Sequence, residues 1–174
     1  MKTLTKQMLQ TLFIYDESSG EFRHKVTKSS NARAGDIAGS LNNLGYRETN
    51  INGTVYLVHR LIWLYKTGKF PDKTIDHKDC DRSNNKWENL REATREEQAA
   101  NSLVRSESTT GFKGICLSTH RGYPIVVASI SVGSKRYSKT RRYTNRTIQS
   151  CIDELLPWLE GKRKELHGEF ANNG

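Results

Sequence analysis

The N-terminal part of the chain alternates between short hydrophobic runs and turn-forming residues, which is the pattern of β-hairpins. Ser18-Ser19-Gly20 separates two β-prone segments, and Asn52-Gly53, the strongest hairpin signal in the chain, separates two more. The expected strands are residues 12–15, 21–26, 46–51 and 55–58. Residues 1–12 read as a short helix or an arm. The pattern therefore predicts a β-rich N-terminal region.

In the middle of the chain, the spacing of hydrophobic residues changes twice. The predicted order is a helix at 59–67, a strand at 74–77, a polar loop at 78–88 and a second strand at 89–94. Thr94 and Glu97 have the spacing of a capping box, so we expect a helix to begin at Arg95. The unit is therefore strand, loop, strand, helix.

The C-terminal part has a different organisation. Residues 102–110 are rich in Ser and Thr without hydrophobic period, which is typical of a linker. The elements expected after it are strands at 112–118, 124–132 and 135–144 and an amphipathic helix at 147–166. Pro157 should kink this helix or lie near a break. The whole pattern predicts an α+β protein.

The net charge of the chain indicates which class of partner to expect. Its 174 residues carry 28 Lys and Arg against 19 Asp and Glu, a net charge of +9. Residues 101–174 hold 12 basic and 6 acidic residues, so this shorter part contributes +6. Such an excess favours a polyanion, nucleic acid before membrane.

The spacing of the cysteines and the absence of long apolar runs indicate the cellular compartment in which the protein is expected. The three cysteines are far apart and form no CxxC pair, which argues against a disulfide framework and a cysteine-ligated zinc. No signal peptide and no stretch long enough to span a membrane is evident. We therefore expect a reducing, intracellular setting and no membrane partner.

Candidate chemistry is concentrated where the strand at 74–77 ends. Hydrolysis of a phosphodiester needs a base for the water and a positive charge for the phosphate. His77 offers the base and the neighbouring Asp76 a hard oxygen ligand for a divalent cation. Gln98 and Asn101, three residues apart on the following helix, add amide oxygens. An isolated Asp-His pair is common, so the spacing of the whole stretch carries the prediction.

This stretch resembles the ββα-metal motif of HNH endonucleases, especially the phage and intron homing type. The likeness covers residues 12–101 and includes Asp76-His77, Asn84-Asn85, Asn89-Leu90-Arg91 and Ala93-Thr94. It implies that His77 is the general base and Asp76 a ligand of Mg²⁺ or Mn²⁺. It also implies that Asn89 pins the loop so that His77 is correctly aimed.

One position departs from the family pattern. The family usually has Asn or His nine residues after the middle asparagine, where this chain has Gln98. Gln98 can be a working ligand, a weak ligand or the mark of an inactive site, and Asn101 is the local substitute. His59 and Arg60 are assigned to the start of a helix, with phosphate binding as the alternative.

A basic segment marks the C-terminal part. Residues 135–146 hold six basic residues and no acidic ones. The segments "TGFKGICLSTHRGYPIVVASISVGSKRYS" and "KELHGEFANNG" resemble the APETALA2-type DNA-binding domain, a three-stranded antiparallel sheet on one helix. The resemblance implies that the sheet contacts DNA. The predicted DNA-binding residues are Lys113, Arg121, Arg136, Lys139, Arg141 and Arg142.

These observations predict a nuclease domain at 1–101, a linker at 102–110 and a DNA-binding domain at 111–174. The expected activity is metal-dependent, site-selective cleavage of double-stranded DNA to 5′-phosphate and 3′-hydroxyl ends, by a monomer or weak homodimer. The resemblance implies the cytoplasm of a bacterial host or phage-infected cell. The alternatives are a DNA-binding regulator with a degenerate HNH site and a nucleic-acid-binding module without sequence preference.

Overall fold

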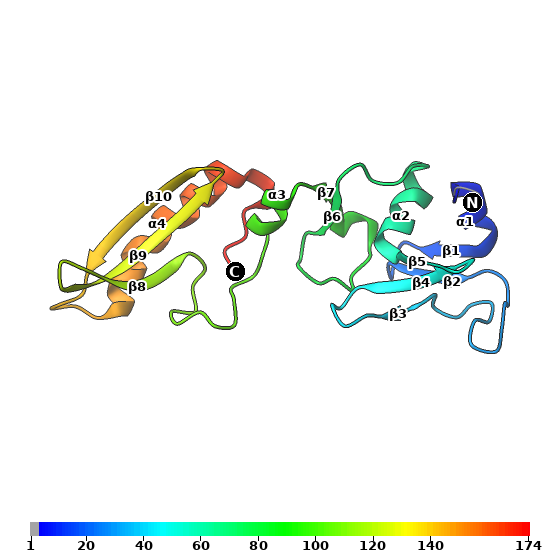
Figure 1. Cartoon of the computed structure of the whole chain (residues 1–174), viewed down its shortest axis with the longest axis horizontal. Coiled ribbons are helices and arrows are strands. Elements are labelled where there is room, and N and C mark those ends of the chain that lie inside the picture. Colours follow the sequence, from blue (N-terminus) through cyan, green and yellow to red (C-terminus); the bar gives the residue numbers. More distant parts are fainter. Residues whose placement is uncertain (1–3) are drawn as a thin grey trace. The chain divides into compact units, whose positions relative to one another are not determined.

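The structure, a computed structural model, describes residues 4–174 and is mixed α+β, as predicted (Figure 1). It forms two compact units, Met1–Thr94 and Arg95–Gly174. Helix α3 (Arg95–Ala100), which the sequence pattern assigns to a nuclease domain, groups with the second unit. The functional extent of each predicted domain stays a prediction.

The first unit contains three small antiparallel sheets. Its elements are α1 (Lys6–Leu12), β1 (Phe13–Asp16), β2 (Glu21–His24), β3 (Ser40–Leu41), β4 (Arg47–Ile51), β5 (Thr54–Leu57), α2 (Val58–Thr67), β6 (Thr74–His77) and β7 (Leu90–Ala93). Strand β3 was not predicted, and residues 1–3 of the predicted helix or arm lie outside the described residues. Asn52 and Gly53 both have positive φ, as the predicted β4–β5 turn requires.

The core of this unit joins the first hairpin to α2. Phe13 and Phe22 are fully buried and stack with ring centroids 4.9 Å apart. Leu61 and Ile62 of α2 are buried in the same cluster. Burial of each such side chain stabilises the fold by roughly 1.5–3 kcal/mol. The hairpin and the helix therefore form one scaffold.

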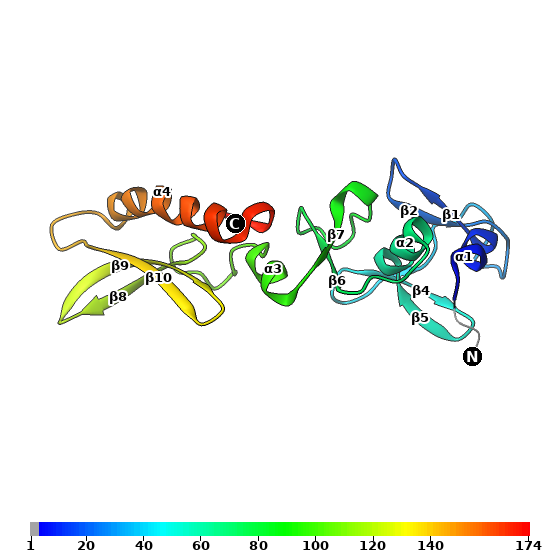
Figure 2. The same ribbon diagram turned by 90° about the horizontal axis from the view of Figure 1, so that it is seen from above.

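The second unit packs one sheet on one helix (Figure 2). Its remaining elements are β8 (Ile115–His120), β9 (Tyr123–Val132), β10 (Lys135–Arg142), α4 (Ile148–His167) and the 3₁₀ turn η2 (Gly168–Phe170). The three strands are antiparallel in the order β10-β9-β8. Val126 and Ala128 of β9 pack against Leu155 and Leu159 of α4. This is the predicted three-stranded sheet packed on a helix.

Two local expectations needed correction. Strand β8 begins at Ile115 rather than Phe112, because Gly114 has a φ of +72° and a Cβ there would lie 2.7 Å from the carbonyl oxygen of Ser129. Helix α4 has no break at Pro157, which lies on its exposed side where water can solvate the unpaired carbonyl. Within residues 4–174, no helix combines the length and apolar character needed to cross a bilayer.

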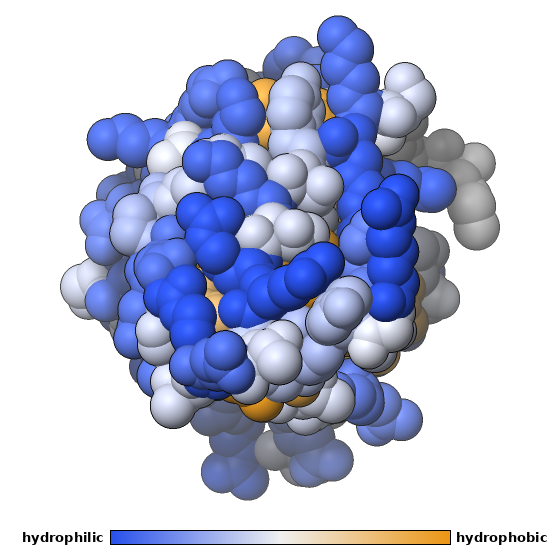
Figure 3. All heavy atoms as spheres, turned by 90° about the vertical axis from the view of Figure 1, so that its left-hand side faces the viewer, coloured by the Kyte–Doolittle hydropathy of each residue, from blue (hydrophilic) through white to orange (hydrophobic). Residues whose placement is uncertain are grey.

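The surface of the second unit is strongly polar on the side that includes the β8–β9 turn. Hydrophilic side chains dominate the face seen in Figure 3, with only small hydrophobic areas between them. Arg121 and Gly122 form this turn with positive φ. Such a surface suits a charged partner better than an apolar one.

Candidate active site

The candidate site is built where two short strands of the first unit end. Strands β6 and β7 are antiparallel, with Asp76 opposite Arg91 and His77 opposite Leu90. His77 is the last residue of β6. The connecting loop starts there and returns through the 3₁₀ turn η1 (Trp87–Asn89). The candidate base His77 and the candidate metal ligand Asp76 therefore lie where the loop leaves β6.

His77 is held by an amide from this loop. Its side chain is 4% exposed, and its Nε2 lies 3.3 Å from Oδ1 of Asn85. Asn85 Nδ2 donates to the carbonyl of Ser83, which leaves Oδ1 as an acceptor. The pairing therefore favours a proton on Nε2 of His77 and a lone pair on Nδ1.

The surroundings of His77 keep the ring neutral. Burial lowers the pKa of His77, while the hydrogen bond to Asn85 and the carboxylate of Asp79 act in the opposite direction. The balance lies below the ordinary value of 6.5. A neutral imidazole at neutral pH is the state that a general base requires.

Asp76 is oriented by a cross-strand ion pair. Its carboxylate Oδ2 accepts a hydrogen bond of 2.9 Å from Nε of Arg91, and the two side chains are only 9% and 11% exposed. Removing one partner of a buried pair leaves an uncompensated charge, which is strongly destabilising. Arg91 therefore fixes the position of the carboxylate.

Asn89 ties the two ends of the loop together. Its Oδ1 accepts from the backbone N–H of Asp79 at 3.1 Å. Its Nδ2 donates to Oδ1 of Asp79 and to the carbonyl of Asn84 at 2.9 and 2.8 Å. Its own carbonyl accepts from Lys78 N–H. A single buried amide thus organises the loop that carries Asn85, the partner of His77.

The first hairpin supports this loop from outside. Gly20 has a φ of +75°, and a Cβ there would lie 2.5 Å from the backbone nitrogen of Lys86. The hydroxyl of Tyr15 donates to the carbonyl of Asn85 at 3.0 Å. Contacts from the first hairpin, which is remote in sequence, therefore fix the position of the loop that carries Asn85.

His59, which the sequence assigned to a helix start with phosphate binding as the alternative, packs on the candidate base. It lies in α2, is 4% exposed, and packs edge-on against His77 with ring centroids 5.2 Å apart. Its Nδ1 has no hydrogen-bond partner among the described residues. Burial lowers the pKa of His59 to about 3. Helical periodicity placed His59 at a helix start, but no local signal showed that this helix packs on His77.

The two amide candidates belong to the second unit. Gln98 is half-buried on α3. Asn101 is 4% exposed, and both its Oδ1 and its backbone carbonyl accept from Nδ2 of Asn172. Asn101 would have to exchange this contact for a cation, and the roles of Gln98 and Asn101 as metal ligands stay predictions.

The donor chemistry fits a hard cation. Among residues 4–174, no group of three or more His, Cys, Asp or Glu side chains is placed to hold a metal ion. Mg²⁺ is usually held by one or two carboxylates, with waters and substrate phosphates as the other ligands. The single carboxylate of Asp76, held by Arg91, is compatible with that mode and not with a structural zinc site.

Strand β10 divides its basic residues between two faces. Neighbouring strand residues point to opposite faces, and Lys139 and Arg141 stand opposite the buried Ala128 and Val126. Arg141 pairs with Glu154 of α4 at 2.8 Å, and the Lys139 ammonium lies 5.2 Å from the Trp158 ring. These two predicted DNA-binding residues therefore point to the helix side.

Arg136 and Arg142 lie on the opposite face of the sheet. Arg136 donates to the hydroxyl of Ser129, and the guanidinium of Arg142 stacks 4.0 Å from the ring centroid of Tyr123. Arg121 is exposed in the β8–β9 turn. Lys113, by contrast, directs its ammonium to the carbonyls of Ala100, Ser102 and Asn172. The six predicted residues thus have three different environments.

Comparison with known proteins agrees with the geometry of the first site. Residues 56–100 match the family model of HNH endonucleases. The chain is 28% identical over 114 residues to Protein 3.8 of Escherichia phage T7, which covers 65% of this chain and 86% of that protein. No solved structure matches the chain. The matched region contains Asp76, His77, Asn89 and Gln98. Over residues 56–100 the chain is therefore similar to HNH endonucleases.

Proposed function

We propose that this protein is a metal-dependent endonuclease that cuts double-stranded DNA at selected sites, in the manner of homing-type HNH enzymes. The observation that carries the proposal is the buried arrangement of Asp76, His77 and Asn89 at the end of the β6–β7 hairpin. A loop with only a structural role does not require a buried neutral histidine next to a carboxylate that is held in one orientation. The resemblance to phage HNH enzymes implies a bacterial or phage-infected cytoplasm as the proposed place of action.

The chain supplies the proton acceptor and orients the attack. A water oxygen forms a bond to phosphorus while its proton passes to Nδ1 of His77, and the bond from phosphorus to the 3′ oxygen breaks. Protonation of that oxygen leaves a 3′-hydroxyl and a 5′-phosphate. A Mg²⁺ or Mn²⁺ ion bound by Asp76 would neutralise charge on the phosphate, and Gln98 or Asn101 stays the amide ligand that the sequence predicts. With one site per chain, a monomer would nick, and two chains would be needed for a simultaneous double-strand cut.

The second unit would hold the DNA, as its resemblance to APETALA2-type domains implies. The sheet face opposite α4 carries Arg136 and Arg142, and Arg121 lies at its edge. A two-stranded ribbon fits the major groove, where arginines contact phosphates and base edges. We assign DNA contact to this face and give Lys139, Arg141 and Lys113 no primary role in it.

The test is incubation of purified protein with supercoiled plasmid and with a phage genome, in Mg²⁺, Mn²⁺ and EDTA. Nicked circles or discrete fragments with either metal, and none in EDTA, are expected. End-labelling should find 5′-phosphates. Intact DNA under every condition would refute the nuclease.

The presence of Gln98, where the family usually has Asn or His, favours a second candidate function. Under it the protein is a DNA-binding regulator whose HNH site is degenerate. The amide oxygen of Gln98 stands on a stem one methylene longer than that of Asn, and a misplacement of about 1 Å can cost about a hundredfold in rate. Under this alternative the wild-type protein retards DNA without cutting it, and Gln98→Asn creates metal-dependent cleavage. Lower activity of Gln98→Asn than of an active wild type would exclude the alternative.

A further inference from the structure

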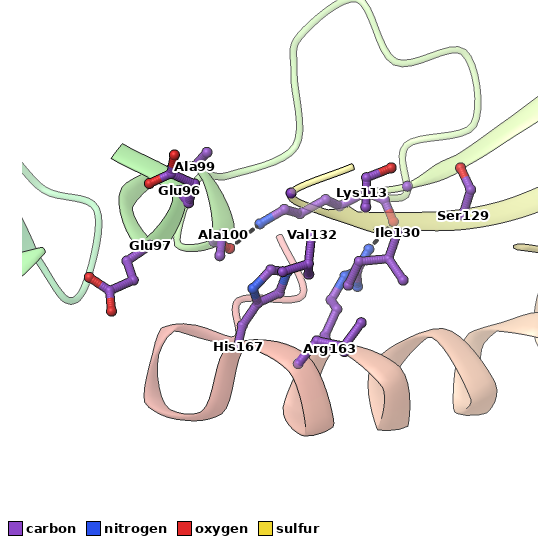
Figure 4. A pocket seen from close by; sticks show the side chains of 14 residues that line it. Glu96, Glu97, Ala99, Ala100, Lys113, Ser129, Ile130, Val132, Arg163 and His167 are labelled. Atoms are coloured by element: carbon purple, nitrogen blue, oxygen red, sulfur yellow. Dashed lines mark hydrogen bonds between the residues drawn. The ribbon is translucent and has the colours of Figure 1, made fainter. Parts of the chain in front are cut away.

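Buried basic side chains of the second unit tie its own segments together. They line a cavity of about 450 Å³ that lies between α3, the β9–β10 turn and the end of α4 (Figure 4). The Lys113 ammonium donates to backbone carbonyls, and Arg163 donates to the Lys113 carbonyl and to Oδ1 of Asn173. An incoming anion would have to displace these bonds. The first unit holds buried rings in a different way, by contact among the rings themselves.

Three rings of the first unit contact one another around the candidate base. The rings of His59 and Tyr46 have their centroids 5.2 Å and 5.9 Å from that of His77, and 5.3 Å from each other. Aromatic rings at such separations prefer edge-on or offset geometries, so each contact restrains the tilt of a ring plane. The hydrogen bond to Asn85 acts on one atom, Nε2 of His77. The ring contacts act on the plane of the imidazole and therefore restrain its orientation.

Tyr46 enters this cluster from a turn that lies just before β4. The backbone N–H of Asn42 donates to the carbonyl of Tyr46 at 2.8 Å. Oδ1 of Asn42 accepts from the N–H groups of Leu44 and Tyr46 at 3.0 and 3.1 Å. An asparagine side chain that accepts from backbone groups ahead of it stabilises a turn locally. Tyr46 is therefore presented to His77 by a turn whose backbone is already fixed.

Arg82 connects the same turn to the loop that begins after His77. Its Nη1 donates to the carbonyl of Leu44 at 2.9 Å, and its guanidinium carbon lies 5.0 Å from the centroid of the Tyr46 ring. A planar guanidinium can lie over an aromatic ring and donate hydrogen bonds at its edge. Arg82 is exposed, so its side chain contributes to this contact and not to the hydrophobic core. The contacts therefore form a closed path from His77 along the loop to Arg82, then to Tyr46 and back to His77.

We propose that Tyr46 and Arg82 are positioning residues for the candidate base. Arg82 holds the Tyr46 ring, and that ring holds the imidazole of His77 in the orientation in which it takes the proton from water. The proposal rests on the proposed nuclease function. A misplacement of about 1 Å can cost about a hundredfold in rate. Loss of the ring contact should therefore slow cleavage without weakening the binding of DNA.

The experiment compares Tyr46→Leu and Arg82→Ala with matched controls of the same unit. Tyr56→Leu removes a half-buried ring that stacks on Phe70. Arg47→Ala removes a guanidinium that donates to a backbone carbonyl at 2.9 Å, as Arg82 does. Tyr46→Phe keeps the ring and loses only the hydroxyl. The nicking rate is measured against plasmid concentration at saturating Mg²⁺, and DNA retardation is measured in EDTA.

We expect kcat to fall about a hundredfold in Tyr46→Leu and about tenfold in Arg82→Ala, which acts on the base through Tyr46. KM for plasmid and DNA retardation should stay at the wild-type level, and Tyr46→Phe and both controls should cut normally. Nitrogen–proton correlation NMR spectra of the metal-free protein report the imidazole of His77 directly. Its signals should shift in Arg82→Ala, where the Tyr46 ring is still present but no longer held, and should not shift in Arg47→Ala.

The readouts separate the positioning role from the nuclease function. Unchanged His77 signals in Arg82→Ala would refute the contact path, and this readout needs no cleavage. Shifted signals with a wild-type kcat in Tyr46→Leu would refute the positioning role and leave the nuclease intact. Equal losses of kcat in Tyr46→Leu and Tyr46→Phe would assign the effect to the hydroxyl, and an equal loss in Tyr56→Leu would assign it to a general loosening of the unit, so either result overturns the proposal. A wild-type protein that cuts in no metal would refute the nuclease and, with it, the role of Tyr46 in cleavage.

Discussion

The β6–β7 hairpin and the β8–β10 sheet use their polar residues in opposite ways. In the hairpin, Asp76, His77 and Asn89 are all buried and are held by side-chain and backbone hydrogen bonds. On the sheet, Arg141 and its partner Glu154 are 43% and 41% exposed, although Arg146 and Arg141 lower the pKa of Glu154 to about 2. The hairpin holds a few polar side chains in fixed positions, whereas the sheet exposes many charged side chains to solvent.

The difference follows from what each region would do. A base must be placed within hydrogen-bond reach of one proton, so its orientation decides the rate. A surface that binds a polyanion works through the number and distribution of its charges, which long exposed side chains supply. Mutations should therefore have large effects on cleavage in the hairpin and graded effects on affinity in the sheet.

The largest effect is expected from His77→Ala. Loss of a general base should lower the nicking rate by about 10²- to 10⁴-fold, because the attacking water loses the group proposed to take its proton. DNA retardation in EDTA should stay at the wild-type level. His120→Ala, which alters an exposed histidine of β8, is the control and should retain cutting. Normal nicking by His77→Ala would remove the hairpin from the mechanism.

A second effect is expected from Asn89→Ala, which deletes three side-chain hydrogen bonds that tie the loop. His77 would lose the alignment that the loop gives it through Asn85, and nicking should fall about a hundredfold. Asn43→Ala, at an exposed position of the same unit, should cut normally. If Asn89→Ala nicks as fast as wild type, the loop does not aim the base.

The third prediction concerns the buried ring of His59 and the pH dependence of stability. Its pKa is about 3 in the folded protein and 6.5 in the ordinary state, so the unfolded chain binds more protons between these values. The free energy of unfolding should be highest above pH 6.5 and fall towards pH 3, by about 1.4 kcal/mol per pH unit from this group.

Urea unfolding of wild type and His59→Phe at pH 7 and pH 5 measures this contribution. The loss of stability between the two pH values should be smaller in His59→Phe by about 2 kcal/mol. His24 and His167, whose pKa values are also lowered, take no part in the contact between His59 and His77 and cancel in the comparison. Equal losses would show that His59 is not buried in its neutral form.

The smallest effect separates the two faces of β10. Arg136→Ala with Arg142→Ala and Lys139→Ala with Arg141→Ala each remove two positive charges. Only the first pair should lower DNA affinity appreciably, and its salt slope should decrease by about 2, which is about 1 per lost phosphate contact. Retardation gels at several salt concentrations provide the measurement. Equal effects of both pairs would mean that net charge, and not a face, determines binding.

Periodicity and turn chemistry predicted most of the secondary structure. Asn52-Gly53, the strand-loop-strand-helix order and the start of α3 at Arg95 were correct because turn preference and capping act over a few residues. Strand β3 was missed because its two residues carry no pattern, and the start of β8 was misplaced because the contact of Gly114 with Ser129 is not local.

The sequence by itself determined the mixed α+β class, the order of the elements and the stretch that carries Asp76, His77 and Asn89, since these depend on near neighbours in the chain. Only the tertiary structure decided that His59 packs on His77, that Lys139 and Arg141 face α4, and that Lys113 and Asn172 fix the end of α3. Those contacts join residues distant in sequence. The burial and strand pairing that create them depend on how whole elements pack, which no local pattern encodes.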